Sequence, residues 1–140
     1  MTALTRFFFR ERSLEPTTAA QTIAWWESRR LPFNMAVGAT GLITLAAVNL
    51  LVALPPHANI LPWQANLIAP AVYGTLANIA YTSGWMAELG IRRWLGDEVE
   101  PAGPALFRYG FAFSIGLTLL PTGLALVGWL ARISSVLFFE

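Results

Sequence analysis

Residues 31–54 read LPFNMAVGATGLITLAAVNLLVAL and contain no charged side chain. A helix that crosses a membrane needs ~20 consecutive, mostly apolar residues, so this stretch is long enough. Pro55 and Pro56 follow it, and proline cannot continue a helix cleanly because it has no backbone N–H to donate. The stretch therefore predicts a membrane-spanning helix that ends near residue 54.

Two further segments, 66–88 and 105–131, are also long and mostly apolar. The later one would be ~40 Å long if fully helical, so it must tilt, kink or protrude, and Pro121 is the expected kink site. Pro70 lies in the first turns of the earlier segment, where proline is better tolerated. The sequence thus predicts an all-α membrane protein with three transmembrane helices.

Residues 18–30, TAAQTIAWWESRR, have the features of a separate helix that precedes the first span. Thr18 and Gln21 have the spacing of a capping box. Tryptophan and isoleucine stand beside glutamate and arginine, a mixture typical of a helix that lies in the membrane interface. Pro32 favours a bend at this point, although the helix could instead continue the first span into the cytoplasm.

The composition is that of a membrane protein. Hydrophobic residues make up 56% of the chain and charged residues 12%, whereas soluble domains carry about 25% charged residues. The absence of cysteine excludes disulfides, thiolate catalysis and cysteine-ligated metals. We divide the chain into a cytoplasmic arm with its interfacial helix, 1–30, and a three-span domain, 31–140.

The arginines indicate the orientation in the membrane. All nine basic residues are arginines, and only Arg132 lies in the C-terminal tail. The other eight lie in the arm, in the second connection or at the start of the third span: Arg6, Arg10, Arg12, Arg29, Arg30, Arg92, Arg93 and Arg108. Because cytoplasmic segments carry the excess of basic residues, we expect the N-terminus in the cytoplasm and the C-terminus outside.

The second span carries a polar face. Gly74, Asn78, Tyr81, Trp85 and Glu88 follow one another at steps of three or four residues and share one side of a helix. The face could line a cavity for a lipid, a quinone or an ion. It could equally pack against another helix, with Gly74 allowing close approach and Asn78 bonding across the contact.

Charged side chains gather at the predicted cytoplasmic ends of the spans. Glu88 ends the second span and Arg108 starts the third, so we expect the two to form an ion pair that lowers the cost of both charges. Arginines near the membrane surface also attract anionic lipids. The candidate contacts with lipid headgroups are Arg29, Arg30, Arg92 and Arg93.

Several classes of catalytic and cofactor site are excluded by residue type. The only histidine is His57, in the first loop, and the only aspartate is Asp97, in the second. A histidine pair for haem, an intramembrane Ser–His pair and an aspartyl dyad are therefore missing. Asp97, Glu98 and Glu100 form an acidic turn that we interpret as solvated, so we expect no catalytic residue, no metal site and no cofactor.

Two motifs, WWESRRLPFN (25–34) and NIAYTSGWMAEL (78–89), resemble a pattern in a family of small uncharacterised bacterial multi-pass membrane proteins. The resemblance implies a location in the bacterial inner membrane and suggests that the two motifs lie together in space. It carries no activity with it.

Small residues four apart predict helix contacts in the third span, at Gly110 with Ser114 and at Ala112 with Gly116. We therefore expect a non-enzymatic integral membrane protein, a structural or accessory subunit of a homo-oligomer or of a larger membrane complex. The alternative is a lipid-, quinone- or ion-binding or conducting module that uses the polar face of the second span. The expected partners are the lipid bilayer and either further copies of the chain or other membrane subunits, and the net charge of +1 gives no reason to expect nucleic acid.

Overall fold

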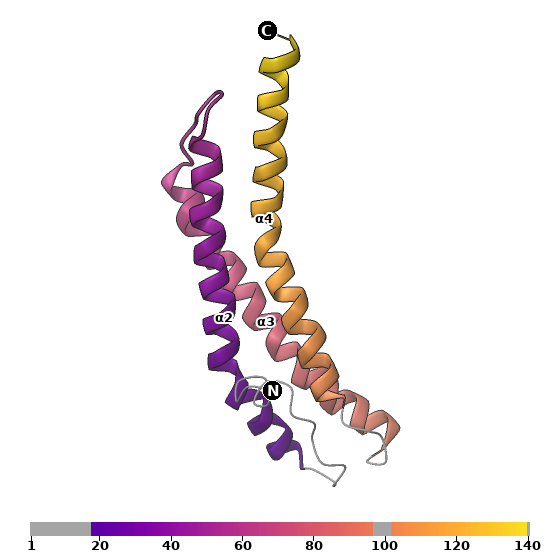
Figure 1. Ribbon diagram of the computed structural model, residues 1–140. Helices are drawn as coiled ribbons and strands as arrows, with labels where there is room; N and C mark the ends of the chain where they lie inside the picture. Colours follow the sequence, from indigo (N-terminus) through magenta and orange to yellow (C-terminus); the bar gives the residue numbers. More distant parts are fainter. Residues whose placement is uncertain (1–17, 97–101, 140) are drawn as a thin grey trace, which may run out of the picture. The chain divides into compact units, whose positions relative to one another are not determined.

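The computed structural model describes residues 18–96 and 102–139, and these form three helices (Figure 1). The helices are α2 (Ala19–Ala53), α3 (Trp63–Leu95) and α4 (Gly103–Phe139). The all-helical fold class is thus confirmed. By length and composition, α2 and α4 can each cross a membrane, but α3 does not meet the same test. The expected third span is therefore not confirmed in this way.

The N-terminus of α2 has the predicted capping box. The backbone N–H of Thr18 donates to Gln21 Oε1 at 2.9 Å, and the backbone N–H of Gln21 donates to Thr18 Oγ1 at 3.3 Å. These two bonds satisfy donors that the first turn of a helix leaves without a partner.

The separate interfacial helix over residues 18–30 was a wrong prediction, because α2 runs without a break from Ala19 to Ala53 with Pro32 inside it. A proline inside a helix costs ~3 kcal/mol. Arg29 and Phe33, on either side of Pro32, are both buried in one core. This packing keeps the backbone helical through the proline, which corresponds to the alternative of one continuous helix.

The end of α2 matches the prediction, whereas α3 and α4 are longer than predicted. α2 ends at Ala53, just before Pro55 and Pro56, as expected. α3 and α4 extend past the predicted apolar segments at both ends. Pro70 and Pro121 both lie inside their helices.

The chain divides into two compact units, and every helix contributes to both. Unit 1 comprises Met1–Met35 and Leu76–Phe113, and unit 2 comprises Ala36–Thr75 and Ser114–Glu140. This division does not test the predicted domains 1–30 and 31–140. Residues 1–17 of the first predicted domain lie outside the described residues.

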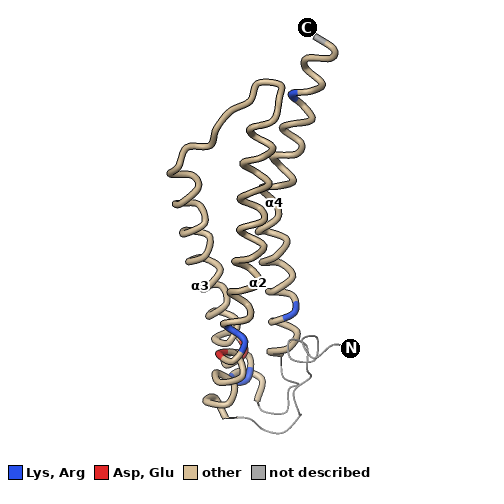
Figure 2. The backbone as a smooth tube through the Cα atoms, turned by 60° about the vertical axis from the view of Figure 1, so that its left-hand side comes forward, with Lys and Arg blue, Asp and Glu red and all other residues tan. Residues whose placement is uncertain are grey.

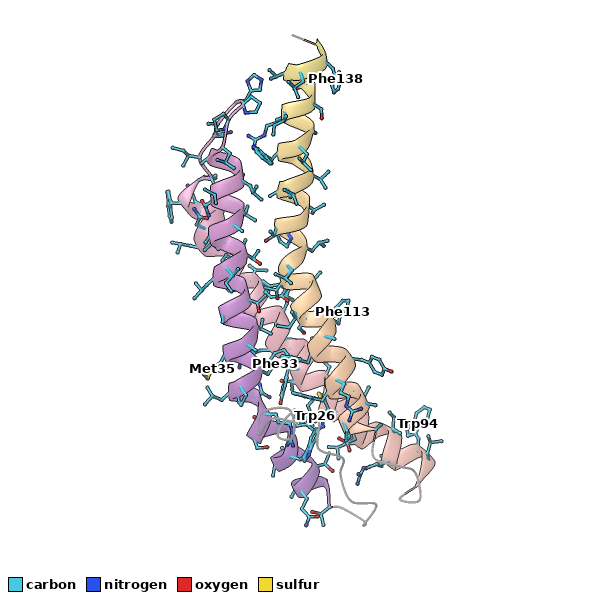
Figure 3. All side chains as sticks on the ribbon, in the orientation of Figure 1. Trp26, Phe33, Met35, Trp94, Phe113 and Phe138 are labelled. Atoms are coloured by element: carbon cyan, nitrogen blue, oxygen red, sulfur yellow. The ribbon has the colours of Figure 1, made fainter. Side chains whose placement is uncertain are left out.

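The core of unit 1 is aromatic. Trp26, Phe33, Tyr81 and Phe107 are buried, and their rings meet mostly edge to face, with centroids 4.7 to 6.3 Å apart. Such pairs contribute ~0.5–1.5 kcal/mol each beyond the area they bury. Figure 3 shows Trp26 and Phe33 directed into the unit, whereas Trp94 points away from it.

Hydroxyl groups join the helices of unit 2. Thr44 donates to the backbone carbonyl of Thr118 at 2.9 Å. The Tyr73 hydroxyl donates to the carbonyl of Ser114 at 2.7 Å. The same hydroxyl lies 2.7 Å from Thr118 Oγ1. Because the partners belong to different helices, these bonds tie α2 and α3 to α4.

Candidate functional site

The motifs 25–34 and 78–89 lie against each other in unit 1, as the resemblance suggested. Side-chain hydrogen bonds join them, between residues on α2 and residues on α3. The partners are Trp26 and Glu88, Arg30 and Thr82, Asn34 and Asn78, and Tyr81 with the backbone carbonyl of Trp26. The two motifs therefore form one contact surface between α2 and α3.

Asn78 bonds to an asparagine on the facing helix. Asn34 Nδ2 donates to Asn78 Oδ1 at 3.2 Å, and Asn78 Nδ2 donates to Asn34 Oδ1 at 2.9 Å. Each amide is both donor and acceptor, so the pair satisfies itself across the contact. This arrangement is the helix-packing role that the sequence allowed for Asn78.

Glu88 is fully buried, and its carboxylate lies against Trp26, Arg92 and Gly103. Trp26 Nε1 donates to Oε2 at 2.7 Å, and Arg92 lies 3.4 Å from Oε1. The carboxylate also lies against Gly103, the first residue of α4, where it would overlap any added Cβ. A negative charge is stabilised at a helix N-terminus, and α4 has no acidic residue in its own first turn.

The expected pair of Glu88 with Arg108 stays a prediction. Glu88 forms an ion pair with Arg92, one turn further along α3. A glutamate and an arginine four residues apart face each other on a helix without any tertiary contact. Arg108 lies on an exposed side of α4.

The glycines that allow close approach differ from the expected one. A Cβ at Gly84 would lie 2.7 and 2.9 Å from ring carbons of Trp26, so any side chain there overlaps the indole. A Cβ at Gly74 would meet nothing within 4 Å. Gly84 and Gly103, rather than Gly74, therefore make room for the two buried partners Trp26 and Glu88.

The predicted polar face is only partly the buried face. Tyr81 and Glu88 are each buried, and Asn78 and Trp85 are half-buried. Gly74 belongs to unit 2, whereas the other four residues belong to unit 1. The positions of α3 that are buried or closely packed run Ala77, Tyr81, Gly84 and Glu88. This row has the same three- and four-residue steps, so spacing alone could not choose between the two faces.

Trp85 is the fourth residue of the predicted polar face. Its ring is half-exposed, but Nε1 is buried and has no hydrogen-bond partner among the described residues.

The four arginines expected at lipid headgroups have different surroundings, although all lie in unit 1. Arg29 is only 6% exposed and lies 3.9 Å from the centroid of the Trp25 ring. Arg30 makes a two-bond pair with Glu27, both bonds 2.7 Å long. Arg92 pairs with Glu88, and Arg93 is exposed. Most of this positive charge is thus used inside the unit.

Arg132, the one arginine expected outside, binds the C-terminal end of α2 in unit 2. Its guanidinium donates to the carbonyls of Leu51 at 2.6 Å, His57 at 3.1 Å and Val52 at 3.4 Å. The last carbonyls of a helix have no partner within it, and a cation there also favours the helix dipole. No local pattern predicts this role, because Arg132 is 75 to 81 positions away from its partners.

Trp129 binds the same loop, since its Nε1 donates to the carbonyl of Pro55 at 2.9 Å. The acidic turn of Asp97, Glu98 and Glu100 lies outside the described residues. Within residues 18–96 and 102–139, no group of three acidic, histidine or cysteine residues is placed to hold a metal. Comparison of the chain with protein-family models, with curated proteins and with solved structures found no match.

Proposed function

We propose that the chain is a three-span integral membrane protein with a structural or accessory role and no catalytic activity. The observation that carries this proposal is that each unit exposes large apolar side chains while it buries several polar ones. The buried polar side chains are Thr22, Arg29, Thr44, Glu88 and Thr118, while large apolar side chains such as Leu42, Ile43, Ile68, Ile79 and Leu124 are more than half exposed. A soluble protein does not expose apolar surface on this scale, whereas lipid covers it without cost.

The proposal that α3 is the third span is supported by where its polar side chains lie. Asn66, Tyr73, Asn78, Tyr81 and Glu88 all bond to groups on α2 or α4. The exposed side chains of α3 include the apolar set Leu67, Ile68, Val72, Leu76, Ile79 and Met86. A helix that turns its polar groups toward protein can span a membrane despite a modest average hydrophobicity.

The same contacts favour a structural role over the alternative of a ligand-binding face. The amide of Asn78, the hydroxyl of Tyr81 and the carboxylate of Glu88 each have a partner inside unit 1. A lipid, quinone or ion on this face would have to displace one of these bonds. The groups that suggested a binding site thus serve the contact between helices.

Orientation follows from the arginine distribution, with the N-terminus in the cytoplasm, the C-terminus outside, and the bacterial inner membrane as the location that the motif resemblance supports. Because the chain has no cysteine, single cysteines report topology directly. Ala58→Cys, in the first loop, should react with an impermeant maleimide added to intact spheroplasts. Leu95→Cys, at the end of α3, should react only after lysis. Equal labelling of both before lysis would contradict three spans.

Assembly is tested at Gly74. A Cβ added there meets nothing within 4 Å, so we expect Gly74→Leu to keep the fold and to weaken a contact with another molecule. Native mass spectrometry in mild detergent should show fewer oligomers, or fewer co-purifying subunits, for Gly74→Leu. The exposed Ala87→Leu on the same helix is the control and should assemble as the unmodified chain does. Unchanged assembly in Gly74→Leu would contradict this contact.

A further inference from the structure

A row of polar side chains reaches the surface along one edge of the contact between α2 and α3 in unit 1. We call this row the polar seam, and its members are Glu27, Arg30 and Asn34 of α2 with Asn78 and Thr82 of α3. Arg30 Nη2 donates to Thr82 Oγ1 at 3.2 Å, and the two asparagines exchange side-chain bonds. Glu27 is exposed and the other four members are half-buried, so the seam is accessible from outside the unit.

The surface beside the polar seam is apolar. Leu31, which lies between Glu27 and Asn34 at steps of four and three residues, is 69% exposed. Ile79 and Met86 of α3 are each 57% exposed. Both amides of the seam lie within the apolar segments predicted to cross the membrane. Polar groups at that depth are costly next to lipid and normally face protein, so the seam favours a polar partner that covers it.

The chemistry of the polar seam is complementary to itself. Glu27 and Arg30 carry opposite charges one turn apart, and their side chains are 43% and 30% exposed. A carboxamide has two N–H donors and two acceptor lone pairs, and Asn34 uses one of each in its bonds with Asn78. A surface that holds both members of each interaction matches a second copy of itself across a two-fold axis.

We propose that the polar seam is the contact between two copies of this chain. Copies that insert with the same topology meet about an axis along the membrane normal, so residues of equal depth face each other. Glu27 of each copy then faces Arg30 of the other, and the Asn34 amides pair across the axis. A single asparagine in a helix contact is known to fix register and oligomeric state in this way.

A second copy fits the polar seam better than an unrelated subunit. An unrelated subunit would need a carboxylate, an arginine and an amide of its own at the matching depths, whereas a second copy carries all three. The proposal rests on the assembly part of the proposed function and names both the partner and the surface.

The first test measures proximity between copies. Because the chain has no cysteine, single cysteines report such contacts directly. Leu31→Cys, reconstituted in phosphatidylcholine vesicles and oxidised with copper phenanthroline, should form a disulfide-linked dimer on non-reducing gels. Phe113→Cys is the matched control, because Phe113 lies on α4 in the same unit and is also 69% exposed. It should remain monomeric.

The second test exchanges the charges of the polar seam in the Leu31→Cys background. Glu27→Arg and Arg30→Glu each place like charges opposite one another, so each should lower the cross-linked fraction about fivefold, the equivalent of ~1 kcal/mol for an exposed ion pair. Co-reconstitution of the two variants, one with a tag that shifts its gel position, should restore cross-linking as a mixed dimer. Each arginine of one copy then meets a glutamate of the other, although the pair within each chain stays broken.

The outcomes separate the polar seam from the proposed function. Absence of recovery in the mixed sample overturns the seam contact, because the charges then act only within one chain. Equal cross-linking of Leu31→Cys and Phe113→Cys overturns it as well, since random collision explains both. Oligomers in native mass spectrometry without cross-linking at Leu31→Cys overturn the seam contact and leave the proposed assembly in place. A monomer with no co-purifying subunit overturns both proposals.

Discussion

Unit 1 and unit 2 are built from the same three helices, yet their interiors differ in chemistry. Of the buried hydrophobic residues that the structure describes, all but Val37 belong to unit 1. Unit 2 instead buries Thr44 and Thr118 and holds its helices through hydroxyl groups that bond to backbone carbonyls. The described charges follow the same division, because Arg132 is the only arginine or acidic residue among the described residues of unit 2 (Figure 2).

The difference predicts two kinds of response to substitution. Interlocked rings lose many contacts at once when one ring is removed, and the cavity that remains adds to the loss. Hydrogen bonds between membrane helices contribute less, ~0.6 kcal/mol on average, because the separated helices find other partners. Unit 1 should therefore be sensitive to changes of volume, whereas unit 2 should lose stability in small steps.

The largest effect is expected at Trp26, which is 2% exposed and contacts the rings of Trp25, Tyr81 and Phe107. Trp26→Ala should lower the free energy of unfolding by ~3–5 kcal/mol, because it leaves a cavity and removes the donor to the Glu88 carboxylate. Unfolding in mixed micelles, followed by far-UV circular dichroism as denaturing detergent is added, measures the change. Trp63→Ala, at a 67% exposed position, should be nearly neutral. Similar losses for both would contradict an aromatic core in unit 1.

Smaller changes in stability are expected when one helical glycine in each unit is replaced by alanine. Gly84→Ala forces a methyl group into the Trp26 indole and should cost ~1–3 kcal/mol. Gly41→Ala in unit 2 places its Cβ 3.8 Å from a Thr118 methyl carbon, an ordinary contact, and should stabilise α2 by ~0.5–1 kcal/mol. The two variants carry the same chemical change within a helix, so the same unfolding measurement compares them directly. Opposite signs are expected, and equal signs would contradict the close packing at Gly84.

The sequence was informative where a local rule applied. The absence of charge over 31–54, the prolines at 55 and 56 and the spacing of Thr18 and Gln21 each predict a feature that the structure contains. Pro32 misled the prediction for the same reason, since local preference favours a break there and only the buried neighbours on both sides of the proline override it.

The contacts of the site could be predicted only in part, because helical spacing does not determine which face meets a neighbour. Asn78 was identified as needing a partner, but its partner Asn34 lies on another helix. Gly84 and Gly103 gain their importance only from Trp26 and Glu88, which fill the space beside them. Glu88 pairs with Arg92 along its own helix, a contact that helical spacing allows but that the comparison of membrane depths did not identify.

The smallest expected effect compares two asparagine pairs that join α2 to α3, one in each unit. Asn34 and Asn78 exchange bonds of 3.2 and 2.9 Å in unit 1, and Asn49 and Asn66 exchange bonds of 2.9 and 3.4 Å in unit 2. All four residues are half-buried, so the pairs differ mainly in their other bonds.

That difference predicts the order of the two coupling energies. Asn49 also donates to the carbonyl of Leu45 at 2.8 Å and keeps this bond when Asn66 is replaced. The side chain of Asn34 has no second partner among the described residues, so replacing Asn78 leaves its amide unsatisfied. Double-mutant cycles with leucine, measured by the same unfolding titration, should give a coupling near ~1.7 kcal/mol in unit 1 and near ~0.6 kcal/mol in unit 2, the upper limit and the average for bonds between membrane helices. A larger coupling in unit 2 would show that the surrounding core, rather than the second partner of Asn49, determines how much each amide pair contributes.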